Sequence, residues 1–337
     1  MKLHQKFGLI LSTISLLSFM SYANAETKVI ASIKPLHSLV SYVMDGVGTP
    51  GILVDGSSSP HTFQLKPSHA TMLQEADIVF WIGEDLESFL ETPLESIAAN
   101  SRHITLMESD EIELLKFREK NIFGGHDDHD DHGDEHDEHA DEHGDEHDEH
   151  DEHADEHGDE HDDHHDGHAH GEHDIHFWLD PEIAKTIVKI VTRELSEIDP
   201  TNASTYKSNS IKAVNEIDQL ISDTRSKINS NASYVVFHDA YQYFEKRFGV
   251  EVVGALTVNP EVLPGAKQLS EIREVIEHEN INCLFSEPQF NPSIAETIAQ
   301  DTGVKAAVID PLGAELNPGK DLYFDLIGNI ASSFESC

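Results

Sequence analysis

The chain has 337 residues, and its 64 acidic residues against 22 basic ones give a formal net charge of -42 at pH 7. This length can form one large domain or two of ordinary size, with a substantial core. Because binding to nucleic-acid phosphates needs a basic surface, the acidic balance excludes nucleic acid as a partner. The acids are concentrated, since residues 126–174 hold 25 of them with 16 histidines and no Lys or Arg.

Residues 1–25 have the pattern of a secretory signal peptide. Two lysines precede an apolar run over residues 7–20, and Ala-Asn-Ala at 23–25 supplies the small residues of a cleavage site. An uncleaved membrane anchor is the alternative, but a spanning helix needs about 20 apolar residues and this run is shorter. No cysteine follows the run to carry a lipid. We therefore expect cleavage before Glu26 and a mature protein that is free outside the cytoplasm.

Four short apolar runs follow, of the kind that forms buried strands. They are VIASI (29–33), GILVD (51–55), ADIVFWIG (76–83) and HITLM (103–107), and helix-like stretches such as PSHATMLQEA separate them. Strands alternating with helices in this way are typical of a parallel sheet in an α/β fold. The alternation stops at Gly124-Gly125, where a tract of acids and histidines begins.

This acidic histidine tract, residues 124–174, contains the segment DEHADEHGDEH twice, at 137–147 and 151–161. It buries too little apolar surface to offset chain entropy, so we expect a disordered loop. A neutral solvated insertion is one interpretation. The other is an accessory metal-binding loop, because imidazoles three and four residues apart, beside carboxylates, offer many equivalent sites to Zn, Cu, Ni or Co. Its candidate ligands are His126, His129, His132, His136, His139, His143, His147, His150, His153, His157, His161, His164, His165, His168, His170 and His173.

Two helices are expected after the tract. Residues 181–198 have apolar residues at helical spacing, with Asp180 as N-cap and Pro181 at the first helical position. The next helix, over about 201–228, has an apolar stripe from Ile211 to Ile221 and would span about 42 Å. That length is unusual inside a compact lobe, and such a helix could connect two lobes.

Strand-like runs resume at SYVVFH (233–238), VEVVGAL (250–256), INCLFSE (281–287) and KAAVID (305–310), with helices between them. We therefore expect an α/β protein of two similar lobes, each a parallel sheet flanked by helices. The first lobe takes residues 26–198, including the loop at 124–174, and the second takes 230–337. A linker helix over 199–229 joins them.

Three histidines outside the tract stand where a binding site is expected. His61 lies just beyond the strand GILVD, His176 lies just before a helix, and His238 ends the strand SYVVFH. In open α/β sheets, ligands bind outside the carboxyl ends of the strands, so these positions can converge on one cleft. Each of them, taken singly, can also be an ordinary polar loop residue.

The two cysteines are Cys283 and Cys337, the latter the last residue. In an oxidising compartment one disulfide between them is the simplest arrangement, and it would stabilise the fold by roughly 4 kcal/mol in the chain-entropy model. Two unpaired thiols are the alternative. Two thiolates alone cannot form a zinc-finger type of centre.

Five segments in order carry a resemblance to a known family. They are SPHTFQLKPS (59–68), HFWLDPEIA (176–184), VVFHDAYQYFEKRFGV (235–250), CLFSEPQF (283–290) and VIDPLG (308–313). Together they resemble the periplasmic zinc-binding proteins of ABC importers, the ZnuA type of the metal-binding substrate-binding proteins, over essentially the whole mature chain. That family also has a His/Asp/Glu-rich loop at the same place and a late cysteine pair. The resemblance implies two α/β lobes joined by a long helix, with one metal ion in the cleft between them.

Carried over by position, the resemblance makes His61 and His176 ligands from the first lobe and His238 a ligand from the second. Manganese-binding relatives have a carboxylate in place of His238, and three nitrogens favour zinc over manganese. Some zinc-binding members have a glutamate directly before the first histidine, where this chain has Pro60. The fourth ligand is therefore a water or Asp310. Asp310 can equally be a structural cap before Pro311.

Three functions are compatible with these residues. The resemblance implies a transport protein that captures Zn²⁺ in the periplasm and delivers it to the membrane permease of a zinc ABC importer, as a monomer and without catalysis. The tract would then collect or sense zinc, and a periplasmic zinc chaperone is a candidate further partner. A secreted zinc hydrolase is the second hypothesis. The sequence has no HExxH or GxSxG motif that would place a base beside the metal, and Glu287 is the residue that could be proposed as a base. A metal-storage or adhesion protein is the third, with the tract as its main function.

Overall fold

The computed structural model describes residues 26–118, 120–123, 171–228, 232–260 and 262–337. The expected signal peptide, residues 1–25, lies outside the described residues, as does the tract from residue 124 to residue 170. Within the described part of the chain, none of the helices has the length and apolar character needed to cross a membrane.

The first lobe is a parallel four-stranded sheet with helices packed against it. Its elements are β1 (Val29–Ile33), α1 (Lys34–Val43), β2 (Gly51–Val54), α2 (Pro67–Glu75), β3 (Ile78–Trp81), α3 (Glu91–Ser96), β4 (Arg102–Thr105) and α4 (Pro181–Ile198), with 3-10 helices at Pro60–Thr62, Ser88–Leu90, Leu106–Glu108 and Phe177–Leu179. The strand order is β2-β1-β3-β4. Every residue of β1 is buried, as expected for a central strand covered on both faces.

The second lobe repeats this plan. Its elements are β5 (Ser233–His238), α6 (Gln242–Phe248), β6 (Glu251–Thr257), α7 (Ala266–His278), β7 (Cys283–Ser286), α8 (Ser293–Thr302), β8 (Lys305–Val308) and α9 (Leu322–Glu335). The strand order is β6-β5-β7-β8, so in both lobes the first strand lies between the second and the third. The expected fold class, two similar parallel α/β lobes, is confirmed.

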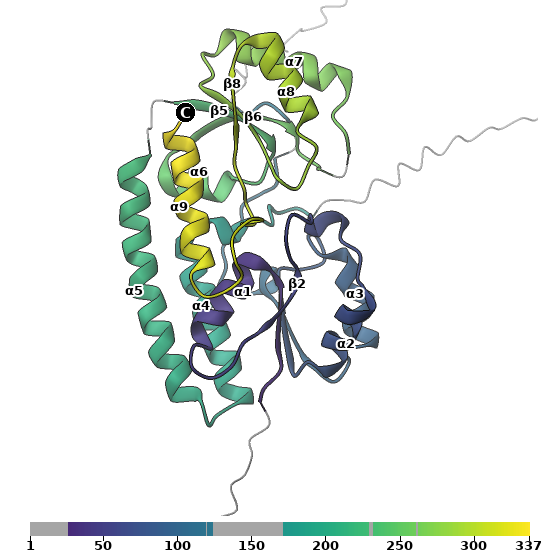
Figure 1. The fold of residues 1–337 in the computed structure, drawn as a ribbon, viewed down its shortest axis with the longest axis vertical. Coiled ribbons are helices and arrows are strands. Elements are labelled where there is room, and N and C mark those ends of the chain that lie inside the picture. Colours follow the sequence, from purple (N-terminus) through teal and green to yellow (C-terminus); the bar gives the residue numbers. More distant parts are fainter. Residues whose placement is uncertain (1–25, 119, 124–170, 229–231, 261) are drawn as a thin grey trace, which may run out of the picture.

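The long helix α5 (Ala203–Lys227) runs along one side of the molecule, from the first lobe to the second (Figure 1). Its 25 residues agree closely with the helix expected over 201–228. The expected apolar stripe is wrong at its start, because Ile211 is 65% exposed. Ile217 and Ile221 of the expected stripe are buried, and Tyr206 and Ala213 join them on the face of α5, which packs against α4 and α1.

The C-terminal helix α9 packs against α1 and α5, so it ties the end of the chain to the first lobe. The Tyr323 amide donates to the Ser38 hydroxyl at 2.9 Å, and the Tyr323 hydroxyl donates to the Trp178 carbonyl at 2.8 Å. A disulfide joins Cys283 in β7 to Cys337 after α9, which confirms the expected pairing. The lobes are thus held together by several segments besides the linker helix.

The start of α4 also connects the lobes. Asp180 caps the helix, because its Oδ1 accepts from the Glu182 amide at 2.8 Å, and Pro181 occupies the first turn as the sequence predicts. The same carboxylate accepts two hydrogen bonds of 2.7 Å from Arg247 in α6. A paired Arg–carboxylate contact of this kind fixes orientation as well as distance, so it holds the segment before α4 against the second lobe.

Candidate metal centre

His61 reaches the cleft from the first sheet. The chain leaves β2, and the turn after it ends in the 3-10 helix Pro60–Thr62, in which proline occupies the first turn. The His61 ring is half-buried and lies 5.9 Å from the His176 ring and 6.1 Å from the His238 ring, measured between centroids. The segment that follows the carboxyl end of β2, an edge strand of the parallel sheet, thus carries this side chain into the cleft, as the rule for open sheets predicts.

His176 is fixed by buried groups on both sides. The three residues after it, Phe177–Leu179, form a fully buried 3-10 helix that anchors the segment in the core. Two residues before it, the Asp174 Oδ1 atom accepts from the His176 amide at 2.9 Å and pairs with its Nδ1 atom at 2.8 Å. Because the ionised carboxylate only accepts, Nδ1 carries the proton and Nε2 is left with a free lone pair.

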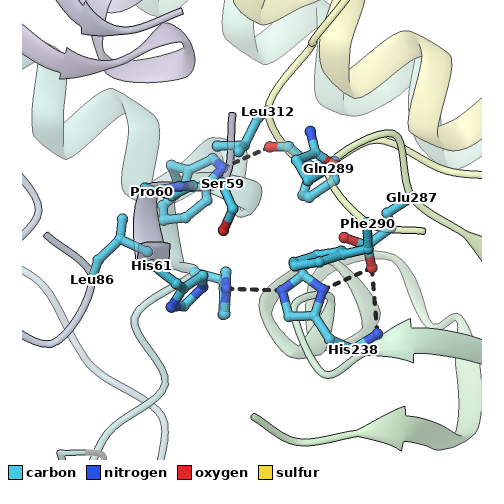
Figure 2. A pocket seen from close by; sticks show the side chains of 12 residues that line it. Ser59, Pro60, His61, Leu86, His238, Glu287, Gln289, Phe290 and Leu312 are labelled. Carbon is cyan, nitrogen blue, oxygen red and sulfur yellow. Dashed lines mark hydrogen bonds and ion pairs between the residues drawn. The ribbon is translucent and has the colours of Figure 1, made fainter. Parts of the chain in front are cut away.

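His238, the last residue of β5, has the same support from the second lobe. Its Nδ1 atom pairs with Glu287 Oε1 at 2.8 Å, and Glu287 directly follows β7, the strand beside β5. The carboxyl ends of two adjacent parallel strands therefore supply the imidazole and the group that orients it (Figure 2). A carboxylate behind a histidine is the usual support of a metal-binding imidazole, and it directs Nε2 into the cleft.

The three imidazoles converge on one point between the lobes. One nitrogen from each of His61, His176 and His238 lies within 4.8 Å of the other two. The Nε2 atoms of His176 and His238 are 3.4 Å apart, and tetrahedral zinc with Zn–N bonds of about 2.0–2.1 Å needs nitrogens roughly 3.3 Å apart. Within the described residues this is the one group of three or more His, Cys, Asp or Glu with such geometry. The donor set fits a borderline cation such as zinc.

The protonation of the centre favours a cation. Burial lowers the pKa of His176 well below its ordinary value, and the neighbouring His238 adds to the effect, so the imidazole is neutral and free to bind a metal. Burial raises the pKa of Asp174 to about 7 against the opposing effect of the His176 amide and of Arg118. A bound cation would stabilise the ionised form of this carboxylate.

A buried ionic cluster lies behind the centre. Arg118 donates to Asp239 Oδ1 at 3.0 Å and to both carboxylate oxygens of Glu245, at 3.2 and 2.8 Å. Burial raises the pKa of Asp239 and of Glu245 to about 7, and the Arg118 charge opposes this rise. The cluster thus connects Asp239, which follows His238, to Arg118, which lies shortly before the tract. No pattern in the sequence predicts this contact.

The cavity at the centre has a volume of about 10 Å³ and is lined by residues of both lobes. That is about the least that one water or ion requires. Apart from the histidines, its walls include the apolar side chains of Leu86, Phe290 and Leu312 (Figure 2). Three lining atoms, Ser59 Oγ, Glu287 Oε2 and Gln289 Oε1, are buried and make no hydrogen bond with the described residues. The cavity is thus shaped for a small species with hydrogen-bonding capacity.

Asp310 does not join the three histidines. Its Oδ1 atom accepts from the amides of Leu312 and Gly313 at 3.0 Å each, and its Oδ2 atom accepts from the amide of Ala314. Gln289 donates a further hydrogen bond of 2.8 Å to Oδ1. The structure gives Asp310 the capping role that the sequence left as one of two interpretations. It organises the loop that carries part of the cavity wall.

The tract meets the centre at its C-terminal end. Of its candidate ligands, His173 is within the described residues and the other histidines, His126 to His170, lie outside them. A disordered loop is expected at residues 171–174. In the structure, His173 forms an isolated antiparallel β-bridge with Lys116, and Asp174 is buried against His176. The spacing of Asp174 and His176, two residues apart, was the signal that could have placed this end in the site.

The remaining described histidines have structural contacts elsewhere. His37 is buried in α1 with Nε2 3.1 Å from the Pro50 carbonyl, and His103 Nε2 lies 2.9 Å from the Ala98 carbonyl. His278 is exposed at the end of α7. His69 is half-buried because its Nδ1 atom accepts from the Lys66 amide and caps α2.

Comparison with known proteins finds relatives over nearly the whole chain. The sequence profile of the family described as zinc-uptake complex component A, periplasmic, matches residues 29–337. The high-affinity zinc uptake system protein ZnuA of Brucella abortus (strain 2308) is 43% identical over 319 residues, covering 94% of this chain and 93% of the relative. The protein of the same name from Haemophilus influenzae is 40% identical over 329 residues, covering 96% of each chain.

A solved crystal structure of ZnuA superimposes with a TM-score of 0.69, at 20% identity, and covers 93% of this chain and 99% of its own. At that identity the superposition shows a shared fold. The sequence comparisons go further, because the profile matches residues 29–337 and the two relatives match at least 94% of the chain at 40% identity or more. The chain belongs to the family of periplasmic zinc-uptake proteins of the ZnuA type.

Proposed function

We propose that this chain is the extracytoplasmic zinc-binding component of a high-affinity zinc ABC importer. It captures Zn²⁺ with His61, His176 and His238 and delivers the ion to the membrane permease. The observation that carries the proposal is the convergence of these three imidazoles from both lobes, two of them with Nδ1 bonded to a buried carboxylate. The relatives' role in zinc uptake supports the choice of ion.

The same residues argue against hydrolysis. A catalytic zinc needs a base that can reach the metal-bound water. Glu287 supports His238 through Oε1, and the cavity of about 10 Å³ has room for one small species but not for a substrate beside a metal-bound water. We therefore propose that the protein binds and releases zinc without chemical change to any substrate.

The location, the partners and the tract complete the proposal. Cleavage of residues 1–25 would release the protein into the periplasm, where it acts as a monomer on its permease and can receive zinc from a chaperone. The histidines of the tract would collect or sense zinc as an accessory to the cleft. The ties between the lobes, through α5, α9 and the Asp180–Arg247 pair, favour a small closure on binding rather than a wide hinge motion.

Growth under zinc limitation tests the transport role. In the bacterium that carries this chain, loss of its gene should prevent growth in chelator-treated medium, and the intact gene should restore it. A gene with His238→Ala should fail, whereas one with His278→Ala should succeed, because His278 is exposed and remote from the cleft. A gene lacking residues 124–170 should still restore growth. If it failed while the His238→Ala gene succeeded, storage by the tract would be the function.

A further inference from the structure

A second cavity lies against the metal centre on the side of the tract. Its volume is about 20 Å³, and its lining includes His61 and His176 as well as Asp85, His173 and Asp174. This volume exceeds what one water molecule requires, so the cavity can hold a water or a small cation. Two of the three imidazoles of the centre are therefore accessible from this cavity as well as from the central one.

The lining changes from exposed to buried along this second cavity. Asp85 and His173 are half-buried and reach the solvent, while Asp174 is 2% exposed and His176 is 5% exposed. The cavity thus extends from these half-buried residues to the ligands, and its lining holds two carboxylates, Asp85 and Asp174, and one imidazole besides the ligands, that of His173. Its wall also includes the apolar side chains of Phe117, Ile175, Val258 and Pro260. A recess lined by one sign of charge concentrates the field and attracts ions of the opposite sign.

Asp174 supplies an unused acceptor at the inner end. Its Oδ1 atom is occupied by the amide and the ring of His176, but its Oδ2 atom is buried and accepts no hydrogen bond from any described residue. A buried carboxylate oxygen without a partner is costly. A cation with part of its water shell would satisfy it, by direct contact or through a bound water.

The lining of the central cavity is less suited to a hydrated ion. Its lining includes Leu86, Trp178, Phe290 and Leu312, which cannot replace the water that a divalent ion loses. Ser59 and Gln289 add neutral polar atoms, and Glu287, the one acid of this lining, pairs with His238 through Oε1. Of the two cavities, the one lined by Asp85 and Asp174 is electrostatically better suited to an ion that arrives hydrated and must exchange its water molecules for protein ligands.

We propose that the cavity between Asp85 and His173 is the port through which Zn²⁺ enters and leaves the cleft. The inference rests on the proposed zinc-binding function. Asp85 attracts the hydrated ion, and His173 binds it at the outer end of the cavity. The Asp174 Oδ2 atom then accepts hydrogen bonds from the water molecules that the ion still holds, while His61 and His176 bind the ion itself. His173 is also the last histidine of the tract, so the tract ends at the mouth of this port.

The test is kinetic, because groups along a route change the rates of binding and release together. Trp178 reports cleft occupancy, since its ring lies 5.3 Å from the His176 ring, and zinc is mixed with the full chain in a stopped-flow fluorimeter. Release is followed after addition of excess chelator. For Asp85→Asn and for His173→Gln we expect both rates to fall about 5- to 10-fold at low salt, with the dissociation constant unchanged within about twofold.

Two control variants sharpen the result. Glu84→Gln removes the exposed acid beside Asp85, outside the cavity, and should leave both rates as in the wild type. Asp85→Glu restores the charge and should restore most of the rate. In Asp85→Asn, the association rate should also depend less on ionic strength, which a merely structural defect would not produce.

The outcomes separate the two proposals. If Asp85→Asn and His173→Gln bind and release zinc at wild-type rates, the port is refuted while the zinc site stands. If they weaken zinc at an unchanged association rate, they belong to the binding site and the port is again refuted. If the wild-type chain shows no tight zinc signal from Trp178, the proposed function fails and the port fails with it.

Discussion

The Nε2 atoms of His176 and His238 lie 3.4 Å apart across the boundary between the two lobes. Each ring has Nδ1 bonded to a buried carboxylate, Asp174 or Glu287, so two lone pairs face one another in a desolvated site. A cation between them removes this repulsion, and a third nitrogen, from His61, stands within reach. The arrangement is preorganised for a metal ion before the ion arrives.

The carboxylates behind the ligands should control affinity although they do not touch the ion. Asp174→Asn and Glu287→Gln replace a charged acceptor with an amide that can also present its NH₂ group to Nδ1. We expect zinc affinity to fall about 10- to 100-fold in each, as for other groups that orient metal-binding histidines. Competition with a chelator of known affinity measures this. The exposed Glu277→Gln is the matched control, and equal affinity in all three variants would contradict the prediction.

Asp310→Asn separates the capping role from a ligand role. The change weakens the hydrogen bonds to the amides of residues 312–314, so the free energy of unfolding should fall by about 1–3 kcal/mol. Zinc affinity should fall by less than about tenfold, or 1.4 kcal/mol. Urea unfolding and zinc titration measure the two effects. A loss of affinity as large as that of His238→Ala would make Asp310 a ligand.

The disulfide should stabilise the fold without contributing to the metal centre. Cys283 and Cys337 are 54 positions apart, and closing a loop of this length contributes about 4 kcal/mol in the chain-entropy model. The double variant Cys283→Ala, Cys337→Ala should unfold at lower urea concentration by that free energy. It should keep its zinc stoichiometry, and the wild type treated with a reductant should match it. A lost zinc site in the folded variant would contradict this.

Acid should destabilise the zinc-free protein partly through His37. Burial lowers the pKa of His37, with the hydrogen bond to the Pro50 carbonyl opposing the shift. Below the unfolded pKa of about 6.5 the unfolded chain takes up a proton that folded His37 refuses, so the free energy of unfolding falls as the pH drops through this value. His176, also buried, contributes with the same sign.

His37→Gln removes one of these groups, so its unfolding free energy should fall less steeply than that of the wild type between about pH 7 and pH 5.5. Urea unfolding at three pH values measures the slope. His278→Gln changes an exposed imidazole and should keep the wild-type slope. An unchanged slope in His37→Gln would contradict the assignment.

Much of the fold follows from local patterns, and the centre follows from where the strands end. VIASI and SYVVFH become β1 and β5 with the expected bounds, because continuous apolar runs suit strands buried on both faces. His61 and His238 converge because both follow carboxyl ends of parallel strands. The sequence could not rank the two roles of Asp310, since capping depends on how the following loop folds back onto its carboxylate.

The groups behind the ligands were harder to predict. Glu287 lies 49 positions from His238, and only the pairing of β5 with β7 brings them together. Arg118 finds Asp239 and Glu245 across more than a hundred residues, and no local pattern marks such a contact. Ile211 was placed on the buried face of α5 because its type is apolar, but the orientation of a long helix is set by the helices around it.

The most direct test of the central claim is calorimetric titration of zinc at pH 7.5 into the mature chain lacking residues 124–170, beside the same chain with His61→Ala. This deletion retains Gly171 to Asp174, which the structure places at the centre. One tight equivalent of zinc that weakens at least about 100-fold on mutation, or 2.8 kcal/mol, would agree with a cleft site served by the tract. Absence of tight binding in the folded, tract-deleted chain would contradict it, and the tract itself would then be the site of zinc binding.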